Sequence, residues 1–247
     1  MIGREEQALL QRSVQAVREA MAQAERAAGR QPGSVLLCAA SKTRTADTVR
    51  FAAGLEIDVF GENRVQELVE KTAAGAYAPK PCHFIGHLQT NKVKQVVGCA
   101  LIQSVDSARL VEKIGAEAHK RGQRQDILLE VNIGGEQSKS GVEPAGLWAL
   151  LEQAAACPSV QVRGLMTIPP ASQAPGEARR YFAAMRGLFE QAAARWQGDG
   201  RVRMEVLSMG MSGDFAEAIA EGATLVRVGT ALFGPRLPWP AANGAAQ

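Results

Sequence analysis

One lysine stands at a position where its amine could react with an aldehyde. Lys42 directly follows the β-like run Val35–Ser41, and side chains on a strand alternate between two faces. Leu36, Cys38 and Ala40 would share its face, and the small residues leave space below the amine. Because burial penalises the charged form of a lysine, such an amine becomes nucleophilic. The alternative is a lysine just past a strand end that reaches into solvent.

A glycine-rich turn supplies the second chemical feature. Residues 208–214 read Ser-Met-Gly-Met-Ser-Gly-Asp and lead straight into a helix-patterned stretch. The glycines allow close backbone approach, and a helix start offers free N–H groups to an anion. Gly229 and Thr230 follow the next β-like run and add a second donor-rich turn. Together the two turns predict a phosphate cup. The alternative is that Ser212 only caps its helix, and Asp214 would slightly oppose a bound phosphate.

A third candidate is Arg227, which would share its strand face with Leu225 and Gly229 and point inward. A buried guanidinium cannot stay unpaired. Arg227 could form an ion pair with an inward carboxylate such as Glu130 or Glu205, contact a ligand, or do both.

Other familiar site motifs receive little support. His83 and His87 have the H-x-x-x-H spacing that brings two metal ligands together on a helix, but their segment is typical of a strand, so no metal is expected. The sequence contains no G-x-G-x-x-G, no G-x-x-x-x-G-K-[ST] and no G-x-S-x-G. Dinucleotide, P-loop and serine-hydrolase sites therefore have no motif here.

The elements that must position these residues alternate along the chain. About eight β-like runs are found, at Val35–Ser41, Ile57–Phe60, His83–His87, Leu101–Val105, Ile127–Asn132, Val160–Thr167, Met204–Ser208 and Leu225–Val228. Helix-patterned stretches lie between them, at Asp47–Ala53, Arg64–Ala73, Ala108–Arg121, Leu147–Ala156, Arg179–Ala194 and Phe215–Glu221. Strands separated by helices favour a parallel sheet. Eight such units predict an α/β protein with a (β/α)8 TIM barrel, and a doubly wound open sheet is the alternative.

The two ends of the chain differ from this pattern. Residues 1–30 predict one extra amphipathic helix before the barrel, because apolar residues recur at helical spacing until Gly29 and Pro32. Residues 235–247 are rich in Pro, Ala and Gly and predict a loose tail. No Pro/Gly-rich linker divides the chain, so residues 1–247 are expected to form a single domain.

Composition limits the function classes. The 247 residues carry a net charge of only +3 with no long basic block, so nucleic acid is not an expected partner. No run approaches the roughly 20 apolar residues of a membrane span, and no membrane partner is expected. Four widely spaced cysteines and a charged N-terminus indicate a reduced compartment without a signal peptide. We therefore expect a cytoplasmic protein, and a monomer because no exposed apolar helix face suggests an obligate dimer.

The chain resembles the pyridoxal 5′-phosphate (PLP) homeostasis proteins, a family of single-domain, alanine-racemase-like barrels. The resemblance covers Val35 to Gly234, in order. It is carried by Ala40-Ser41-Lys42-Thr43, Phe60-Gly61-Glu62-Asn63 with Val65-Gln66-Glu67, His83-Phe84-Ile85-Gly86-His87-Leu88-Gln89 with Asn91-Lys92, Glu130-Val131-Asn132, Ser138-Lys139-Ser140-Gly141, Gly164-Leu165-Met166-Thr167-Ile168, Leu207 through Ser212 with Asp214, and Val226-Arg227-Val228-Gly229-Thr230 with Phe233-Gly234.

The resemblance implies a PLP-binding barrel that holds its cofactor as a Schiff base on Lys42. It implies that Asn63 lines the pocket and that Arg227 lies beside the pyridine nitrogen or near the phosphate. The implied phosphate contacts are Ser208, Met209, Gly210, Ser212, Gly229 and Thr230. It further implies a role in intracellular vitamin B6 homeostasis without catalytic turnover, with PLP and PLP-dependent apo-enzymes as candidate partners.

A physical reason accompanies the implied absence of turnover. Racemases of the related fold need a second acid/base, which an additional β-domain supplies, and this sequence leaves no room for one after the eighth strand. The protein decides which chemistry a bound cofactor can perform. The alternative is a PLP-dependent amino-acid racemase-like enzyme in which His87 or a lysine at the rim substitutes. A different barrel enzyme, acting on a phosphorylated metabolite through Lys42, is a further alternative.

Overall fold

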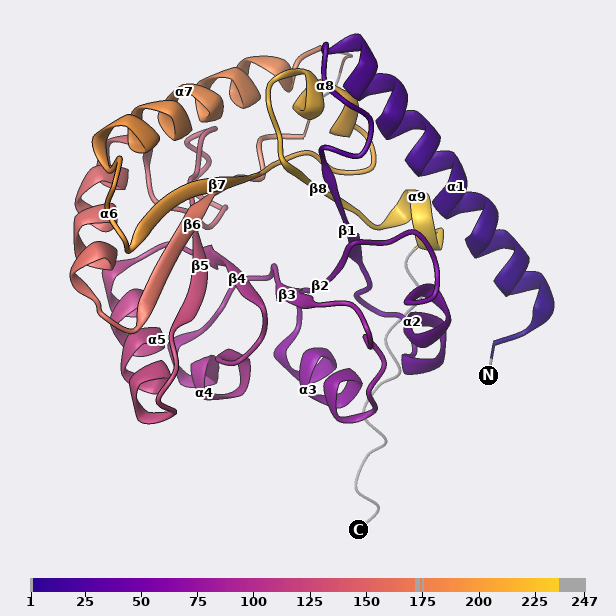
Figure 1. Ribbon diagram of the computed structural model, residues 1–247, viewed down its shortest axis with the longest axis horizontal. Coiled ribbons are helices and arrows are strands. Elements are labelled where there is room, and N and C mark those ends of the chain that lie inside the picture. Colours follow the sequence, from indigo (N-terminus) through magenta and orange to yellow (C-terminus); the bar gives the residue numbers. More distant parts are fainter. Residues whose placement is uncertain (1, 172–173, 175, 236–247) are drawn as a thin grey trace.

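Eight parallel strands close into a barrel in the computed structural model, which describes residues 2–171, 174 and 176–235 (Figure 1). The strands pair in chain order, and the last pairs with the first. Their bounds are β1 (Leu36–Ala40), β2 (Val59–Glu62), β3 (Cys82–Phe84), β4 (Leu101–Val105), β5 (Gln125–Glu130), β6 (Val160–Met166), β7 (Val202–Ser208) and β8 (Leu225–Val228). The predicted barrel is confirmed, and the open sheet is excluded because β1 and β8 share a parallel ladder.

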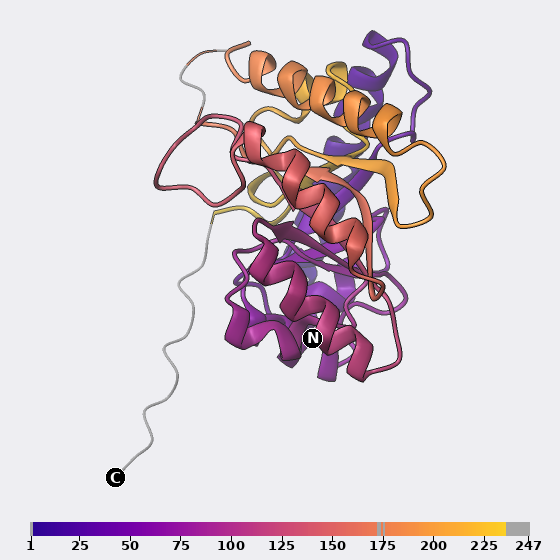
Figure 2. The same ribbon diagram turned by 90° about the vertical axis from the view of Figure 1, so that its left-hand side faces the viewer.

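Helices form a ring outside the strands, as the two views show (Figures 1 and 2). The α-helices are α1 (Arg4–Ala27), α2 (Ala46–Ala52), α3 (Val65–Ala73), α4 (Val93–Val96), α5 (Ala108–Lys120), α6 (Leu147–Ala156), α7 (Arg179–Arg195), α8 (Phe215–Ala220) and α9 (Thr230–Phe233). Two short 3-10 helices are η1 (Thr90–Lys92) and η2 (Pro144–Gly146). The extra N-terminal helix, α1, packs against α8 and α9. In the described part of the chain no helix is both long enough and apolar enough to cross a membrane.

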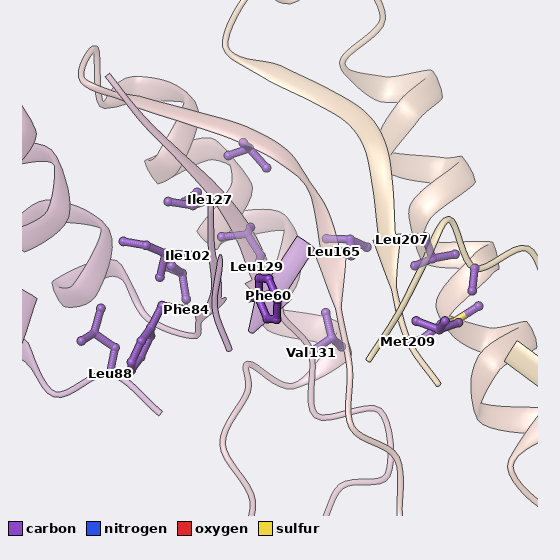
Figure 3. Close-up of a cluster of buried hydrophobic side chains, with 14 of the residues drawn as sticks. Phe60, Phe84, Leu88, Ile102, Ile127, Leu129, Val131, Leu165, Leu207 and Met209 are labelled. Atoms are coloured by element: carbon purple, nitrogen blue, oxygen red, sulfur yellow. The ribbon is translucent and has the colours of Figure 1, made fainter. Parts of the chain in front are cut away.

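Alternating side chains divide the buried residues into two layers. The larger layer lies between strands and helices and includes Phe60, Phe84, Ile102 and Leu129 (Figure 3). A smaller cluster of Cys38, Val59 and Leu225 is separate from it and faces the barrel interior. On β1, Leu37 and Ala39 belong to the outer layer, whereas Cys38 belongs to the inner cluster. The face of β1 that carries Cys38 therefore points into the barrel.

The main departure from the predicted elements is at β3, which ends at Phe84 instead of continuing to His87. Ile85 still donates its N–H to the Glu62 carbonyl oxygen, at 2.9 Å. A side chain at Gly86 would come within 2.1 Å of the Asn63 carbonyl oxygen, so the chain crosses the adjacent loop there instead of extending the ladder.

Two short helices, α4 and α9, were not predicted. Each has four residues, which is too short to show an apolar repeat at helical spacing. Residues 236–247 of the predicted tail lie outside the described residues.

A glycine on β6 provides a test of the strand packing. Gly164 has a φ of 148°, and an added Cβ would lie 1.9 Å from the Val206 carbonyl oxygen of β7. Gly164→Ala should lower the free energy of unfolding by about 3 kcal/mol, because the strand pair must separate locally. The control is Gly122→Ala, where φ is 63° but the space is open; it should cost about 1 kcal/mol. Equal losses in urea unfolding would contradict the proposed clash.

Candidate functional site

A pocket of about 250 Å³ lies where the loops after β1 and β7 meet the end of β8. Its described lining residues come from these three regions: Ala40, Lys42, Thr43, Arg44, Met211, Ser212, Gly213, Arg227, Gly229, Thr230, Phe233 and Gly234. The carboxyl ends of the strands are where barrel proteins place their functional residues. Three cations, Lys42, Arg44 and Arg227, contribute to the lining, so the pocket favours an anionic ligand.

Lys42 is half-buried and lines this pocket. It lies two residues beyond Ala40, the last residue of β1, on the face that carries Cys38 inside the barrel. The next residue, Thr43, has a φ of 63°, so the chain turns sharply immediately after the lysine. The structure therefore places the amine-bearing residue at the barrel mouth, in a wall of the pocket.

Two backbone donors converge on Ser212, which also lines the pocket. The N–H groups of Gly229 and Ala231 both donate to Ser212 Oγ, each at 3.3 Å. Ser212 is not the cap of the following helix, because α8 begins after Asp214. The capping interpretation of Ser212 is therefore wrong. We refer to Ser212, Gly213, Gly229 and Ala231 as the anion corner, and a Cβ on Gly213 would meet no atom within 4 Å.

Asp214 lies just beyond the anion corner and is partly buried. Its Oδ1 accepts a hydrogen bond from the Met211 N–H at 2.6 Å. Burial raises the pKa of the Asp214 carboxyl, and the Met211 N–H opposes the rise. Asp214 therefore stabilises the turn that carries Met211 and Ser212.

Arg227 forms the floor of the pocket and is held by hydrogen bonds to neutral groups. Its Nη1 donates to Ser208 Oγ at 2.6 Å, and its Nη2 donates to the Thr167 carbonyl oxygen at 2.8 Å. Within the described residues, no carboxylate comes within 4.0 Å of it. Glu205, one of the predicted partners, instead pairs with Arg163, so that prediction is wrong. Removal from water lowers the pKa of the Arg227 guanidinium.

Glu130, the other predicted partner of Arg227, stays close enough to influence it electrostatically without forming an ion pair. Burial raises the pKa of the Glu130 carboxyl to about 7, Asp106 adds to the rise, and Arg227 opposes it. Glu130 is therefore a buried acid at the carboxyl end of β5 that can change its protonation near neutral pH.

The hydrogen bonds below Arg227 continue across the barrel in one direction. Ser208 Oγ donates to Gln103 Oε1 at 2.6 Å, and Gln103 Nε2 lies 2.9 Å from His83 Nδ1. An arginine has only donors, so the serine must accept from it and pass its own hydrogen to the glutamine oxygen. The glutamine amide then donates to His83 Nδ1. We call this series of four side chains the donor chain, and it requires a neutral His83 that carries its hydrogen on Nε2.

The structure brings five of the nine sequence-predicted site residues together around the pocket. These are Lys42, Ser212, Arg227, Gly229 and Thr230. Ser208 is not among the described lining residues but accepts a hydrogen bond from Arg227, which is.

The other three predicted residues lie elsewhere. Met209 packs in the outer layer (Figure 3). Gly210 lies against α8, where a side chain would come within 2.5 Å of Ala218 Cβ. Asn63 lines a different pocket of about 750 Å³, with Glu67, His87 and other residues.

Several lining residues were not predicted from the sequence. Arg44 donates to the carbonyl oxygens of Gly234 and Pro235, at 2.9 and 2.5 Å, and lies 5.8 Å from the Phe233 ring centroid. Phe233 and Gly234 formed part of the family resemblance but had no assigned role. Their position directly after the predicted turn at Thr230 could have indicated that they line the pocket. No such indication existed for Arg44, because the turn at Thr43 interrupts the alternation of side chains along the strand.

Comparison with known proteins identifies the family to which this chain belongs. Residues 13–237 match the alanine racemase N-terminal domain family. A pyridoxal phosphate homeostasis protein from Aquifex aeolicus is 46% identical over 210 residues, which are 85% of this chain and 90% of the relative. The chain belongs to the pyridoxal phosphate homeostasis protein family. The homeostasis protein of Bos taurus is 39% identical over 215 residues, 81% of this chain and 77% of that protein.

Solved structures agree with this assignment. PipY of Synechococcus elongatus, solved with PLP bound, has 38% sequence identity and a TM-score of 0.72, and the match covers 88% of this chain and all of PipY. An alanine racemase from Streptomyces lavendulae has 20% identity and a TM-score of 0.70, and the match covers 90% of this chain and 56% of the racemase. The second similarity shows a shared fold alone. Members of the homeostasis protein family are therefore matched over most of their length, and the racemase is not.

The donor chain makes a prediction about acid stability. Burial lowers the pKa of His83 to about 4, whereas an unfolded histidine has a pKa of about 6.5. The unfolded chain binds the proton more readily, so stability falls as the pH drops below 6.5 and this loss is complete near pH 4. At pH 5 the loss is about 2 kcal/mol. The His83→Gln variant keeps an oxygen acceptor for Gln103 and does not titrate.

We therefore expect His83→Gln to lose about 2 kcal/mol less than the wild type between pH 7 and pH 5. The measurement is urea unfolding of both proteins at the two pH values. Identical losses would show that His83 does not titrate as the donor chain requires.

Proposed function

We propose that this chain binds PLP in the 250 Å³ pocket, with the Lys42 amine attached covalently to the cofactor and the phosphate in the anion corner. The observation that carries the proposal is that Lys42 lines the same small pocket as Ser212, the residue on which the two backbone N–H groups converge. The PLP-bound structure of PipY, which shares 38% of its sequence with this chain, supports it.

The residues present fit the phosphate of PLP. The N–H groups of Gly229 and Ala231 already converge on one oxygen, Ser212 Oγ, and an anionic oxygen is a stronger acceptor than a hydroxyl. Gly213 leaves the approach open. Thr230, at the same strand end, can add its hydroxyl. Lys42, Arg44 and Arg227 supply positive charge around a group that carries up to two negative charges.

Each protein group has a separate task in this proposal. Bound PLP supplies an aldehyde and an electron-withdrawing ring. Lys42 provides the amine, and the anion corner orients the ligand toward it. Arg227 keeps its direction because Ser208 and Thr167 accept from both of its terminal nitrogens. In the proposed site Arg227 lies beside the cofactor, and Ser208 acts by holding Arg227.

We further propose that the protein holds and releases PLP in the cell without catalytic turnover. Its curated relatives are named as homeostasis proteins and are matched over most of their length. PLP-dependent apo-enzymes are the partners that such a role would serve. A racemase-like activity is the competing proposal, and the titratable Glu130 at the barrel mouth is the observation in its favour.

The first test is covalent trapping. Borohydride reduction of PLP-loaded protein should fix the cofactor on the peptide that contains Lys42, detected as a mass increase. Lys42→Ala should lose this adduct, while phosphate contacts retain some PLP that inorganic phosphate displaces. Lys120→Ala, which removes an exposed lysine from α5, is the control and should trap normally. An adduct found only on another lysine would refute the assignment.

The second test addresses turnover. We expect PLP-loaded protein to leave single L-amino acids unconverted, because the described residues that line the pocket include no carboxyl or imidazole group that could act with Lys42 as a second acid or base. Chiral chromatography after incubation with L-alanine, against a no-protein control, is the measurement. Steady formation of D-alanine that disappears in Glu130→Gln would favour the racemase-like proposal instead.

A further inference from the structure

Three buried ionisable side chains lie next to the loop that carries Lys42. Glu62 ends β2, and Glu67 and Lys71 lie on α3; at most 3% of each residue is exposed. Lys71 Nζ lies 2.7 Å from Glu62 Oε1 and 3.0 Å from Glu67 Oε2. Buried charges are costly unless they are paired and hydrogen-bonded, so this arrangement calls for an explanation. We call these three residues the buried triad.

The buried triad contacts both neighbours of Lys42 in the sequence. On one side, Ser41 Oγ donates to Glu62 Oε1 at 2.6 Å, and Lys71 Nζ donates to the Ser41 carbonyl oxygen at 2.8 Å. On the other side, the Thr43 N–H donates to Glu67 Oε2 at 2.7 Å. The ammonium group has three hydrogens, and these contacts give it three acceptors. The peptide units that flank Lys42 are therefore both tied to one charged cluster.

The backbone conformation of Thr43 explains why these hydrogen bonds to the buried triad are needed. Thr43 has a φ of 63°, the left-handed region that a β-branched residue rarely adopts. Residues keep such conformations only where their surroundings enforce them. Two hydrogen bonds hold this conformation. The Thr43 N–H donates to Glu67 Oε2 at 2.7 Å, and the Arg44 N–H donates across the turn to the Ser41 carbonyl oxygen at 3.2 Å. Loss of the shorter bond leaves only the turn bond, so the peptide between Lys42 and Thr43 can rotate further, and the direction of the Lys42 side chain changes with it.

We propose that the buried triad is a positioning device for Lys42, which sets the direction of the amine toward the anion corner. None of the triad residues is among the described residues that line the 250 Å³ pocket, so the triad acts through the backbone of Ser41 and Thr43. This inference rests on the proposed attachment of PLP to Lys42. A triad that serves only to stabilise the fold is the competing explanation.

The two explanations differ in what happens after PLP has bound. A structural role changes stability and the amount of folded protein. A positioning role changes how fast bound PLP becomes covalently attached, because small misplacements of reacting groups slow a reaction strongly. The decisive quantity is the first-order rate of attachment at saturating PLP, followed by stopped-flow absorbance and confirmed by borohydride trapping.

Substitutions at Glu67 separate the effects. Glu67→Leu removes the acceptor of the Thr43 N–H and should slow attachment at least about tenfold. Glu67→Gln keeps an oxygen at the same place and should restore the rate to within about twofold of wild type. Glu70→Leu, an exposed position on the same helix, is the matched control and should leave the rate unchanged.

Thermal unfolding of each variant reports stability separately. If Glu67→Leu fails to fold, Ser41→Ala is a milder test: it removes the hydroxyl bond to Glu62, keeps both backbone bonds to the triad, and should slow attachment by about threefold. If Glu67→Leu, or Ser41→Ala in its place, is less stable than wild type but attaches PLP at the wild-type limiting rate, the positioning role is overturned. Wild-type protein that shows no adduct on Lys42 would instead overturn the proposed function, so the two failures are distinguishable.

Discussion

The ladder between β1 and β8 brings together residues from opposite ends of the sequence. Cys38 pairs with Arg227 and Ala39 with Val228, so the loop after β1 emerges beside the turn after β8. Lys42 and Gly229 face one pocket for this reason alone. An open sheet would leave these two strands at separate edges, and the amine and the anion corner would then belong to different surfaces. Closure of the barrel is thus a condition for the site as well as for the fold.

The donor chain occupies part of the barrel interior, which in such barrels is usually filled by apolar side chains. Arg227, Ser208, Gln103 and His83 are all buried, and each buried polar group needs a partner. Their hydrogen bonds satisfy one another without a carboxylate. Among the described residues no carboxylate pairs directly with Arg227, although Glu130 and Asp214 lie close enough to act on its charge. The buried triad on the outer side of β1 differs in this respect, because there the Lys71 ammonium group pairs with two carboxylates.

Much of the fold was predictable because strands and helices alternate with clear apolar periods, and because Lys42, Arg227 and Gly229 fall at strand ends. The sequence could not show which residues of the 208–214 turn face the pocket. Met209 packs between the strands and the helices, Gly210 lies against α8, and Ser212 lines the pocket. Gln103 lies across the barrel from Arg227, a relation that no local pattern reveals. Glu67 and Lys71 look like an ordinary surface pair at i, i+4 spacing, and only their burial shows otherwise.

The one-way polarity of the donor chain limits how its members can change during evolution. Gln103 uses its oxygen toward Ser208 and its amide nitrogen toward His83. A glutamate there could accept from Ser208 but could not donate to the imidazole, which would have to become a donor in turn. A change at position 103 would therefore change which ring nitrogen of His83 carries the hydrogen, although neither residue is among the described residues that line the pocket and the two lie on different strands.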